Sequence, residues 1–218
     1  MTMVRKVVVA VVSVMTLVIL LPTLTVGARA QAPASDATMT RAERAELVDL
    51  LNKSEKEFLD AVESVSDAQW TFKAGPDRWS IGEVAEHLVL AEAGLFSTAT
   101  KSLAAPADDK WTATVGKTEL LKRALPNRTT KVDAPQEIRP RGDLTRGQVM
   151  ARFKEQRART TAFAQETEAP LKTHTAPNPF FGPINAHQLL LYIPLHNLRH
   201  DQQIAEVKTA PDYPRLRP

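Results

Sequence analysis

The chain of 218 residues contains no cysteine. This absence excludes disulfide bonds, a thiol nucleophile and thiolate metal ligands. Hydrophobic residues make up 43% of the sequence, which is enough for a core, and the length is usual for one domain. The fold must therefore rely on packing, either alone or together with a metal bound through ligands other than cysteine.

The sequence also lacks an excess of charge once its N-terminus is set aside. Residues 1–30 carry three of the 28 basic residues, Arg5, Lys6 and Arg29, and no acidic one. The rest of the chain therefore holds 25 basic and 25 acidic residues, and its formal net charge is zero. Because such a chain offers no excess of positive charge to the phosphates of DNA or RNA, we expect no nucleic-acid partner.

Residues 1–30 have the layout of a secretory signal peptide. A basic start precedes the apolar run 7–21, and Ala28-Arg29-Ala30 supplies the small residues of a cleavage site. The run is shorter than the ~20 apolar residues that a membrane-spanning helix needs. We therefore expect cleavage, export to the periplasm or the medium, and no stable membrane insertion afterwards; a retained N-terminal membrane anchor is the alternative.

The remaining sequence shows no internal repeat and no strand pattern, and its apolar residues recur at helical spacing. Residues 31–38 are small and polar and predict a disordered lead-in to a domain at 39–212. Capping boxes of the type Ser/Thr-x-x-Glu/Gln at Thr40, Ser80 and Thr145 indicate where three of the helices begin. Four amphipathic helices are predicted, at 40–65, 80–103, 145–168 and 185–207.

Between the second and third helices lies a long connection, residues 104–143, that is interrupted by proline and glycine. It contains one short predicted helix at 117–125 and is long enough to pass from one end of a helical bundle to the other. Four long amphipathic helices with one such connection predict an all-α fold, a four-helix bundle with a long crossover between helices 2 and 3.

Three of the five histidines are predicted to face the inside of this bundle. His196 and His200 are four residues apart on the fourth helix and therefore lie on one face, and His87 lies on the inner face of the second helix. If these two helices are neighbours, three imidazoles converge, as in the open site of a catalytic zinc, nickel, iron or copper ion. His174 is expected to be solvated in a loop, and His187 to be incidental.

Further residues around these histidines suggest supporting roles. Glu83 and Gln203 are close enough along their helices to accept the second N–H of His87 and His200, although Glu83 is also needed in a capping box. The small residues beyond His87, which are Ala91, Gly94 and Thr98, leave room either for a closely packed helix or for a pocket.

One charged residue lies on a face predicted to be apolar. Arg157 falls within the weak apolar stripe of the third helix. We expect this arginine to extend its side chain to the surface rather than to contact a substrate.

Two motifs carry a family resemblance. The segment DRWSIGEVAEHL at 77–88, followed by His196-x3-His200-x2-Gln203-Ile204, resembles the DinB-like superfamily over about residues 40–212. The resemblance implies an up-down-down-up four-helix bundle with His87, His196 and His200 as ligands of a divalent metal, most often zinc or nickel. It also implies a homodimer, since members are commonly dimeric. Characterised relatives include bacillithiol- or mycothiol-dependent S-transferases, a maleylpyruvate isomerase and hydrolases.

Three functions remain open at this point. The first is an exported metal-dependent enzyme, a hydrolase or S-transferase, acting on a small-molecule substrate. Export argues against S-transfer, because low-molecular-weight thiols belong chiefly to the cytosol. The second is a non-catalytic metal-binding or interaction bundle, and the third is a helical bundle whose histidines are merely hydrogen-bonded.

Overall fold

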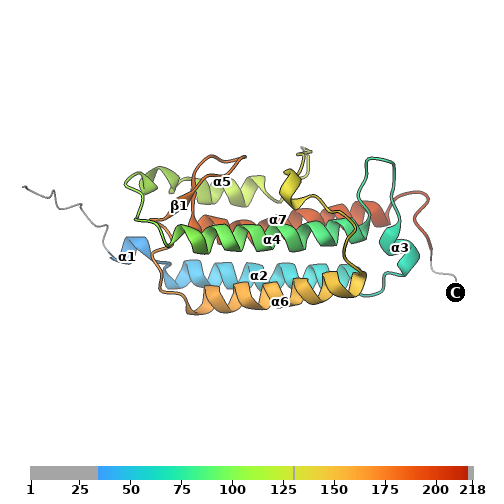
Figure 1. The fold of residues 1–218 in the computed structure, drawn as a ribbon, viewed down its shortest axis with the longest axis horizontal. Helices are drawn as coiled ribbons and strands as arrows, with labels where there is room; N and C mark the ends of the chain where they lie inside the picture. Colours follow the sequence, from blue (N-terminus) through green and yellow to red (C-terminus); the bar gives the residue numbers. More distant parts are fainter. Residues whose placement is uncertain (1–33, 130, 216–218) are drawn as a thin grey trace, which may run out of the picture. The chain divides into compact units, whose positions relative to one another are not determined.

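The computed structural model describes residues 34–129 and 131–215, and the predicted signal peptide at 1–30 lies outside them. Four long helices form the bundle: α2 (Arg41–Val62), α4 (Ile81–Ser102), α6 (Arg146–Glu166) and α7 (Ala186–Lys208). They pack side by side, so the predicted all-α four-helix bundle is confirmed (Figure 1). Within the described residues, no helix has both the length and the apolar composition required to cross a membrane.

Each long helix begins at a complete capping box. The N-cap side chain accepts a hydrogen bond from the N–H three residues later, and the side chain at that later position accepts from the N-cap N–H. The N-cap residues are Thr40, Ser80 and Thr145, as predicted, and Asn185 for α7. A further box at Ser66 opens the short helix α3 (Asp67–Thr71). The helix starts are therefore determined by local sequence.

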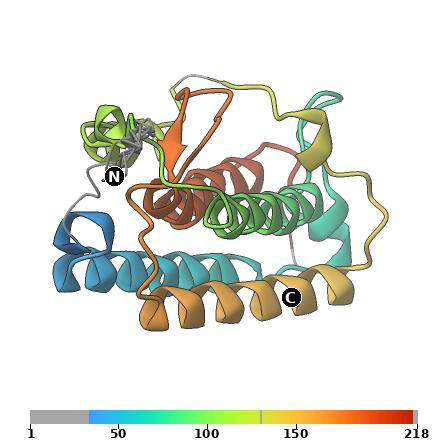
Figure 2. The same ribbon diagram turned by 60° about the vertical axis from the view of Figure 1, so that its left-hand side comes forward.

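Contacts at the helix ends show in which direction each helix runs. Lys208, at the end of α7, donates to the carbonyl of Ala61 near the end of α2, so these two helices are parallel. Arg146, at the start of α6, donates to the carbonyl of Val62, so α6 runs antiparallel to α2. The start of α4 lies beside the end of α7, because Arg78, just before α4, pairs with Glu206 at 3.1 Å, so these two helices are antiparallel. The order is therefore up-down-down-up, with α2 and α4 diagonal to each other (Figure 2).

Because α4 and α6 run in the same direction, residues 103–145 must return along the whole bundle. This crossover contains the 3-10 turn η1 (Trp111–Thr114), the helix α5 (Lys117–Ala124), which packs on α7, and the turn η2 (Gln136–Ile138). Its far end is fixed to α4: the buried Glu86 carboxylate accepts the N–H groups of Arg141 at 3.2 Å and Gly142 at 2.9 Å. The turn η2 is thereby held against α4.

Two peripheral features differ from the sequence-based expectations. The lead-in was predicted to be disordered, but its described part contains the helix α1 (Ala34–Ala37), where Ala37 is buried and its carbonyl accepts the N–H of Lys172 at 2.9 Å. The strands β1 (Thr175–Ala176) and β2 (Ile184–Asn185) pair antiparallel, although no strand was predicted. Strands of two residues are too short to produce an alternating pattern.

The prediction for Arg157 was wrong, because its side chain is 1% exposed in the middle of the bundle. Its guanidinium pairs with the buried Glu92 carboxylate at 3.0 Å and donates to Asn197 Oδ1 at 3.0 Å. It also donates to the Leu51 carbonyl and the Ser54 hydroxyl, each at 2.8 Å. A buried charge is tolerated when it is paired and fully hydrogen-bonded, as here. The apolar stripe of α6 therefore indicated correctly that Arg157 faces the interior of the bundle. The prediction that its side chain extends to the surface was wrong.

Candidate metal centre

Three histidines from two helices converge at one end of the bundle. The Nε2 atom of His196 lies 3.3 Å from Nε2 of His87 and 3.1 Å from Nε2 of His200. One ring nitrogen from each of the three residues lies within 4.8 Å of the others. The convergence follows from the antiparallel packing of α4 and α7, which brings the second turn of α4 beside the middle of α7. The structure thus brings together the three histidines that the sequence grouped.

The orientation of His87 is fixed by the crossover. Its Nδ1 lies 2.7 Å from the carbonyl oxygen of Ile138 in η2. A carbonyl can only accept, so Nδ1 carries the proton and Nε2 presents a lone pair to the other histidines. This partner was not predicted from the sequence. A backbone carbonyl has no residue-type signature, and this one lies 51 residues away along the chain.

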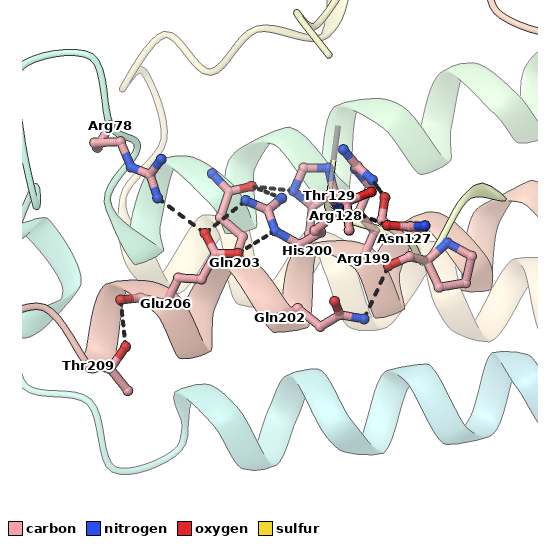
Figure 3. A network of polar contacts seen from close by, with 11 residues as sticks. Arg78, Asn127, Arg128, Thr129, Arg199, His200, Gln202, Gln203, Glu206 and Thr209 are labelled. Atoms are coloured by element: carbon pink, nitrogen blue, oxygen red, sulfur yellow. Dashed lines mark hydrogen bonds and ion pairs between the residues drawn. The ribbon is translucent and has the colours of Figure 1, made fainter. Parts of the chain in front are cut away.

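The orientation of His200 is fixed by Gln203, as predicted. Nδ1 of His200 lies 2.8 Å from Gln203 Oε1, and the same oxygen accepts from Arg128 at 3.2 Å (Figure 3). Because arginine has donors only, its contact identifies this atom of Gln203 as the oxygen, and His200 Nδ1 must therefore donate. Nε2 of His200 is left as a second lone pair. Arg128 is itself held by two bonds to Glu206, at 2.8 and 3.0 Å.

Glu83, the other predicted partner, has a different role. One carboxylate oxygen accepts the Ser80 N–H of the capping box at 2.8 Å, and the other pairs with Lys73 at 2.8 Å. Glu83 lies in the first turn of α4, so its carboxylate is at the N-terminal end of the helix. The group that accepts from Nδ1 of His87 is instead the Ile138 carbonyl. The competing capping role that the sequence suggested is the one observed.

Burial keeps all three imidazoles neutral. It lowers the pKa of His87 to about 4 because the protein interior disfavours the cation. The pKa values of His196 and His200 lie well below the usual range, mainly for the same reason and further because neighbouring imidazolium charges would repel one another. A neutral imidazole is the form that binds a metal.

The donor set fits a divalent metal. Two Nε2 lone pairs are fixed by the bonds at Nδ1, and a single N–H on His196 could satisfy only one of them well. A cation among the three nitrogens would satisfy all of them. Metal–nitrogen bonds of roughly 2.0–2.1 Å at tetrahedral angles separate neighbouring donors by about 3.3 Å. The observed separations of 3.1 and 3.3 Å are close to this value. Three nitrogens do not select among zinc, nickel, iron and copper.

One side of the cluster opens into a cavity of ≈ 820 Å³ that all three histidines line. His196 is partly exposed there, whereas His87 and His200 are 2% and 7% exposed. The Trp79 ring packs against His87 and His200, with ring centroids 4.9 and 6.4 Å apart. Ala91, Gly94 and Thr98 also line this cavity. Of the two predictions for these small residues, the structure therefore supports the pocket.

The other two histidines do not join the cluster. His174 is buried rather than solvated, and its Nδ1 lies 2.9 Å from the carbonyl oxygen of Pro170. It was expected to be solvated because it lies in a loop, but this loop is bound to the start of α7, where the Ala186 N–H donates to the His174 carbonyl at 2.9 Å. His187 is also buried and lines a smaller cavity of ≈ 260 Å³ together with Glu43 and Lys172.

Comparisons with known proteins agree with this fold. The model of one family, the DinB superfamily, matches residues 50–204. In structure, the chain matches YfiT from Bacillus subtilis with a TM-score of 0.51 and 18% identity, over 78% of this chain and 89% of YfiT. YfiT is described as "a probable metal-dependent hydrolase with an unusual four-helix bundle topology". At this identity the match bears on the fold alone. No curated protein matches the sequence.

Proposed function

The chain belongs to the DinB superfamily, and from this premise we propose that it is a metal-dependent enzyme, a hydrolase or transferase that acts on a small molecule. The observation that carries the proposal is the convergence of three neutral imidazoles, two with a fixed Nε2 lone pair, beside an ≈ 820 Å³ cavity. A purely structural metal site is usually closed by four protein ligands, whereas three ligands and an open side are typical of catalysis.

In this proposal His87, His196 and His200 hold a divalent metal, zinc or nickel. When bound, the metal would polarise a carbonyl or phosphoryl oxygen and acidify a water molecule. The chain itself orients the ligands: Ile138 and Gln203 fix two of the rings through their Nδ1 atoms. Trp79 packs against the rings of His87 and His200, and the cavity leaves a path for a substrate.

Hydrolysis is the reaction we favour within this class. The signal-like residues 1–30 suggest export, and water is the nucleophile that every exported enzyme can use. Thiol transfer would require a low-molecular-weight thiol outside the cytosol. The description of YfiT as a metal-dependent hydrolase supports the same choice, although only by analogy of fold.

The first test is metal content. Protein purified without a histidine tag and loaded with zinc or nickel is expected to hold about one metal per chain by elemental analysis. His87→Ala and His200→Ala should each reduce this to below roughly a tenth, because two remaining imidazoles bind far more weakly. His174→Ala, which removes a buried histidine outside the cluster, should keep its metal. Wild-type protein that takes up no metal would overturn the proposal.

The second test is activity. Metal-loaded wild-type protein is expected to cleave at least one class among esters, amides and phosphoesters, and to lose this activity with a chelator and regain it with zinc or nickel. The His200→Ala variant should remain inactive under both conditions while its helical circular dichroism stays unchanged. A fully loaded protein that turns over no substrate would support the non-catalytic metal-binding alternative instead.

A further inference from the structure

The cavity beside the histidines changes character along α4. Around the three imidazoles its walls carry charge, with Arg78, Glu83 and Arg128 among the lining residues. Towards the C-terminal end of α4 most lining residues are apolar, beside the polar Thr98 and Asn178; the apolar ones are Ala91, Gly94, Leu95, Leu189, Phe181 and Tyr192. A ligand that fills the whole space would therefore meet polar groups at one end and hydrocarbon at the other.

The residues of α4 that line the cavity extend from His87 to Thr98, eleven positions or about 16 Å at 1.5 Å per residue, and the apolar ones among them run from Ala91 to Leu95. The small residues Ala91 and Gly94 line the middle of this stretch of α4. Gly94 is exposed among the lining residues, and a Cβ atom built on it would meet no atom within 4 Å, so a larger side chain at this position would enter the cavity.

The opposite wall is held in place by a tight turn over residues 177–183. The side-chain oxygen of Asn178 accepts the N–H groups of Phe180 and Phe181, each at 3.0 Å. Lys117, at the start of α5, donates to the carbonyls of Phe181 at 2.9 Å and Pro183 at 2.6 Å. The two phenylalanines are thus positioned by polar contacts of their backbone, and their rings remain available to the cavity.

Aromatic rings connect this wall to the metal centre. Phe181 meets Tyr192 edge-on with centroids 6.0 Å apart, and Tyr192 lies 5.7 Å from the ring of His196. At the mouth, Phe180 is 45% exposed and Val132 is 56% exposed, and both line the cavity. Apolar surface left in contact with water in one part of a cavity indicates a ligand with a hydrophobic portion.

We propose that the substrate is an amphiphile with a polar head group and an unbranched apolar chain of medium length. The head group reaches the three histidines, and the chain lies over Ala91 and Gly94 between α4 and the turn at 177–183. The position of the head group rests on the proposed function above. The binding of the chain does not, because it depends only on the shape and polarity of the cavity.

The test uses straight-chain carboxylates from acetate to decanoate and measures their affinity by calorimetry, with zinc-loaded and with metal-free protein. Each methylene that enters the cavity is expected to strengthen binding about fourfold until the chain fills it. The Gly94→Leu variant should weaken decanoate binding by at least roughly tenfold and leave acetate unchanged, because the new side chain occupies the open space. Gly147→Leu, on α6 and equally free of neighbours within 4 Å, is the matched control and should bind like wild type.

Two results would overturn the inference: an affinity that does not rise with chain length in the wild type, or equal decanoate binding by the Gly94→Leu and Gly147→Leu variants. Zinc uptake without chain-length dependence would remove the inference and leave the metal centre intact. Chain-length dependence in a protein that takes up no zinc would support the inference and remove the proposed enzyme. Helical circular dichroism of both variants confirms that the comparison is between folded proteins.

Discussion

At the residue scale, the centre depends on groups that never touch the metal position. Gln203 accepts a hydrogen bond from Nδ1 of His200 and another from Arg128, and Arg128 is in turn held by Glu206 (Figure 3). Such outer contacts fix the tautomer and the rotation of a ligating imidazole. The short i, i+3 spacing made Gln203 predictable from the sequence, because residues at that spacing meet on any helix.

Replacing Gln203 should weaken metal binding without removing a ligand. Gln203→Leu leaves the Nδ1 proton of His200 without an acceptor, and we expect zinc affinity to fall by about 10- to 100-fold. Gln203→Glu keeps an acceptor and should bind about as well as wild type. Competition against a chromogenic chelator measures the affinities. Gln202→Leu, which changes an exposed neighbour bonded to the Pro126 carbonyl, is the control. Equal affinities for both leucine variants would contradict this role.

At the scale of the elements, Arg157 links all four long helices. From α6 it reaches Leu51 and Ser54 on α2, Glu92 on α4 and Asn197 on α7. Asn197 directly follows His196, so this network helps to set how far α7 is displaced along α4 and therefore whether the histidines meet. The network explains how α6, whose apolar stripe is weak, is held in the bundle.

Breaking this buried pair from one side should be costly. Glu92→Ala leaves the Arg157 guanidinium buried without its counter-charge, and we expect a loss of about 3–5 kcal/mol in the free energy of unfolding. Replacing both partners, with Arg157→Met and Glu92→Leu, should recover most of this loss, because two apolar residues need no partner. Urea unfolding monitored by circular dichroism provides the values. A loss below about 1 kcal/mol for Glu92→Ala would mean that the pair is not buried as described.

At the scale of the whole molecule, the parallel direction of α4 and α6 determines the site. It forces residues 103–145 to return along the bundle, and the return carries η2 to His87. The centre therefore combines α4, the crossover and α7, which meet only in the folded chain. A metal held by ligands from α4 and α7, with His87 oriented by the crossover, should stabilise the folded state and not the unfolded one.

Metal binding should accordingly raise the melting temperature. Free zinc at a hundred times its Kd adds about 2.7 kcal/mol to the free energy of unfolding. For a chain of this size that corresponds to an increase in Tm of roughly 5–10 °C. The His87→Ala variant should show almost no increase under the same conditions. Differential scanning fluorimetry gives both numbers, and an equal increase in the two proteins would locate the bound zinc elsewhere.

The sequence by itself determined the helices and part of the site. The capping boxes at Thr40, Ser80 and Thr145 and the pair His196 and His200 were all predictable, because they depend on contacts within four residues. The small residues Ala91, Gly94 and Thr98 predicted either a closely packed helix or a pocket, and only the structure distinguished the two.

Only the tertiary structure decided which faces meet. It paired α4 with α7, so that His87 completes the cluster, and it supplied the Ile138 carbonyl from the crossover. It also buried Arg157, where the sequence had suggested solvent. These outcomes depend on partners that lie 40 to 109 residues apart along the chain. They also depend on the balance between the free energy that a polar group loses on leaving water and the free energy that its buried hydrogen bonds return. That balance exists only once the helices have packed, because no local pattern specifies which buried partner will be present.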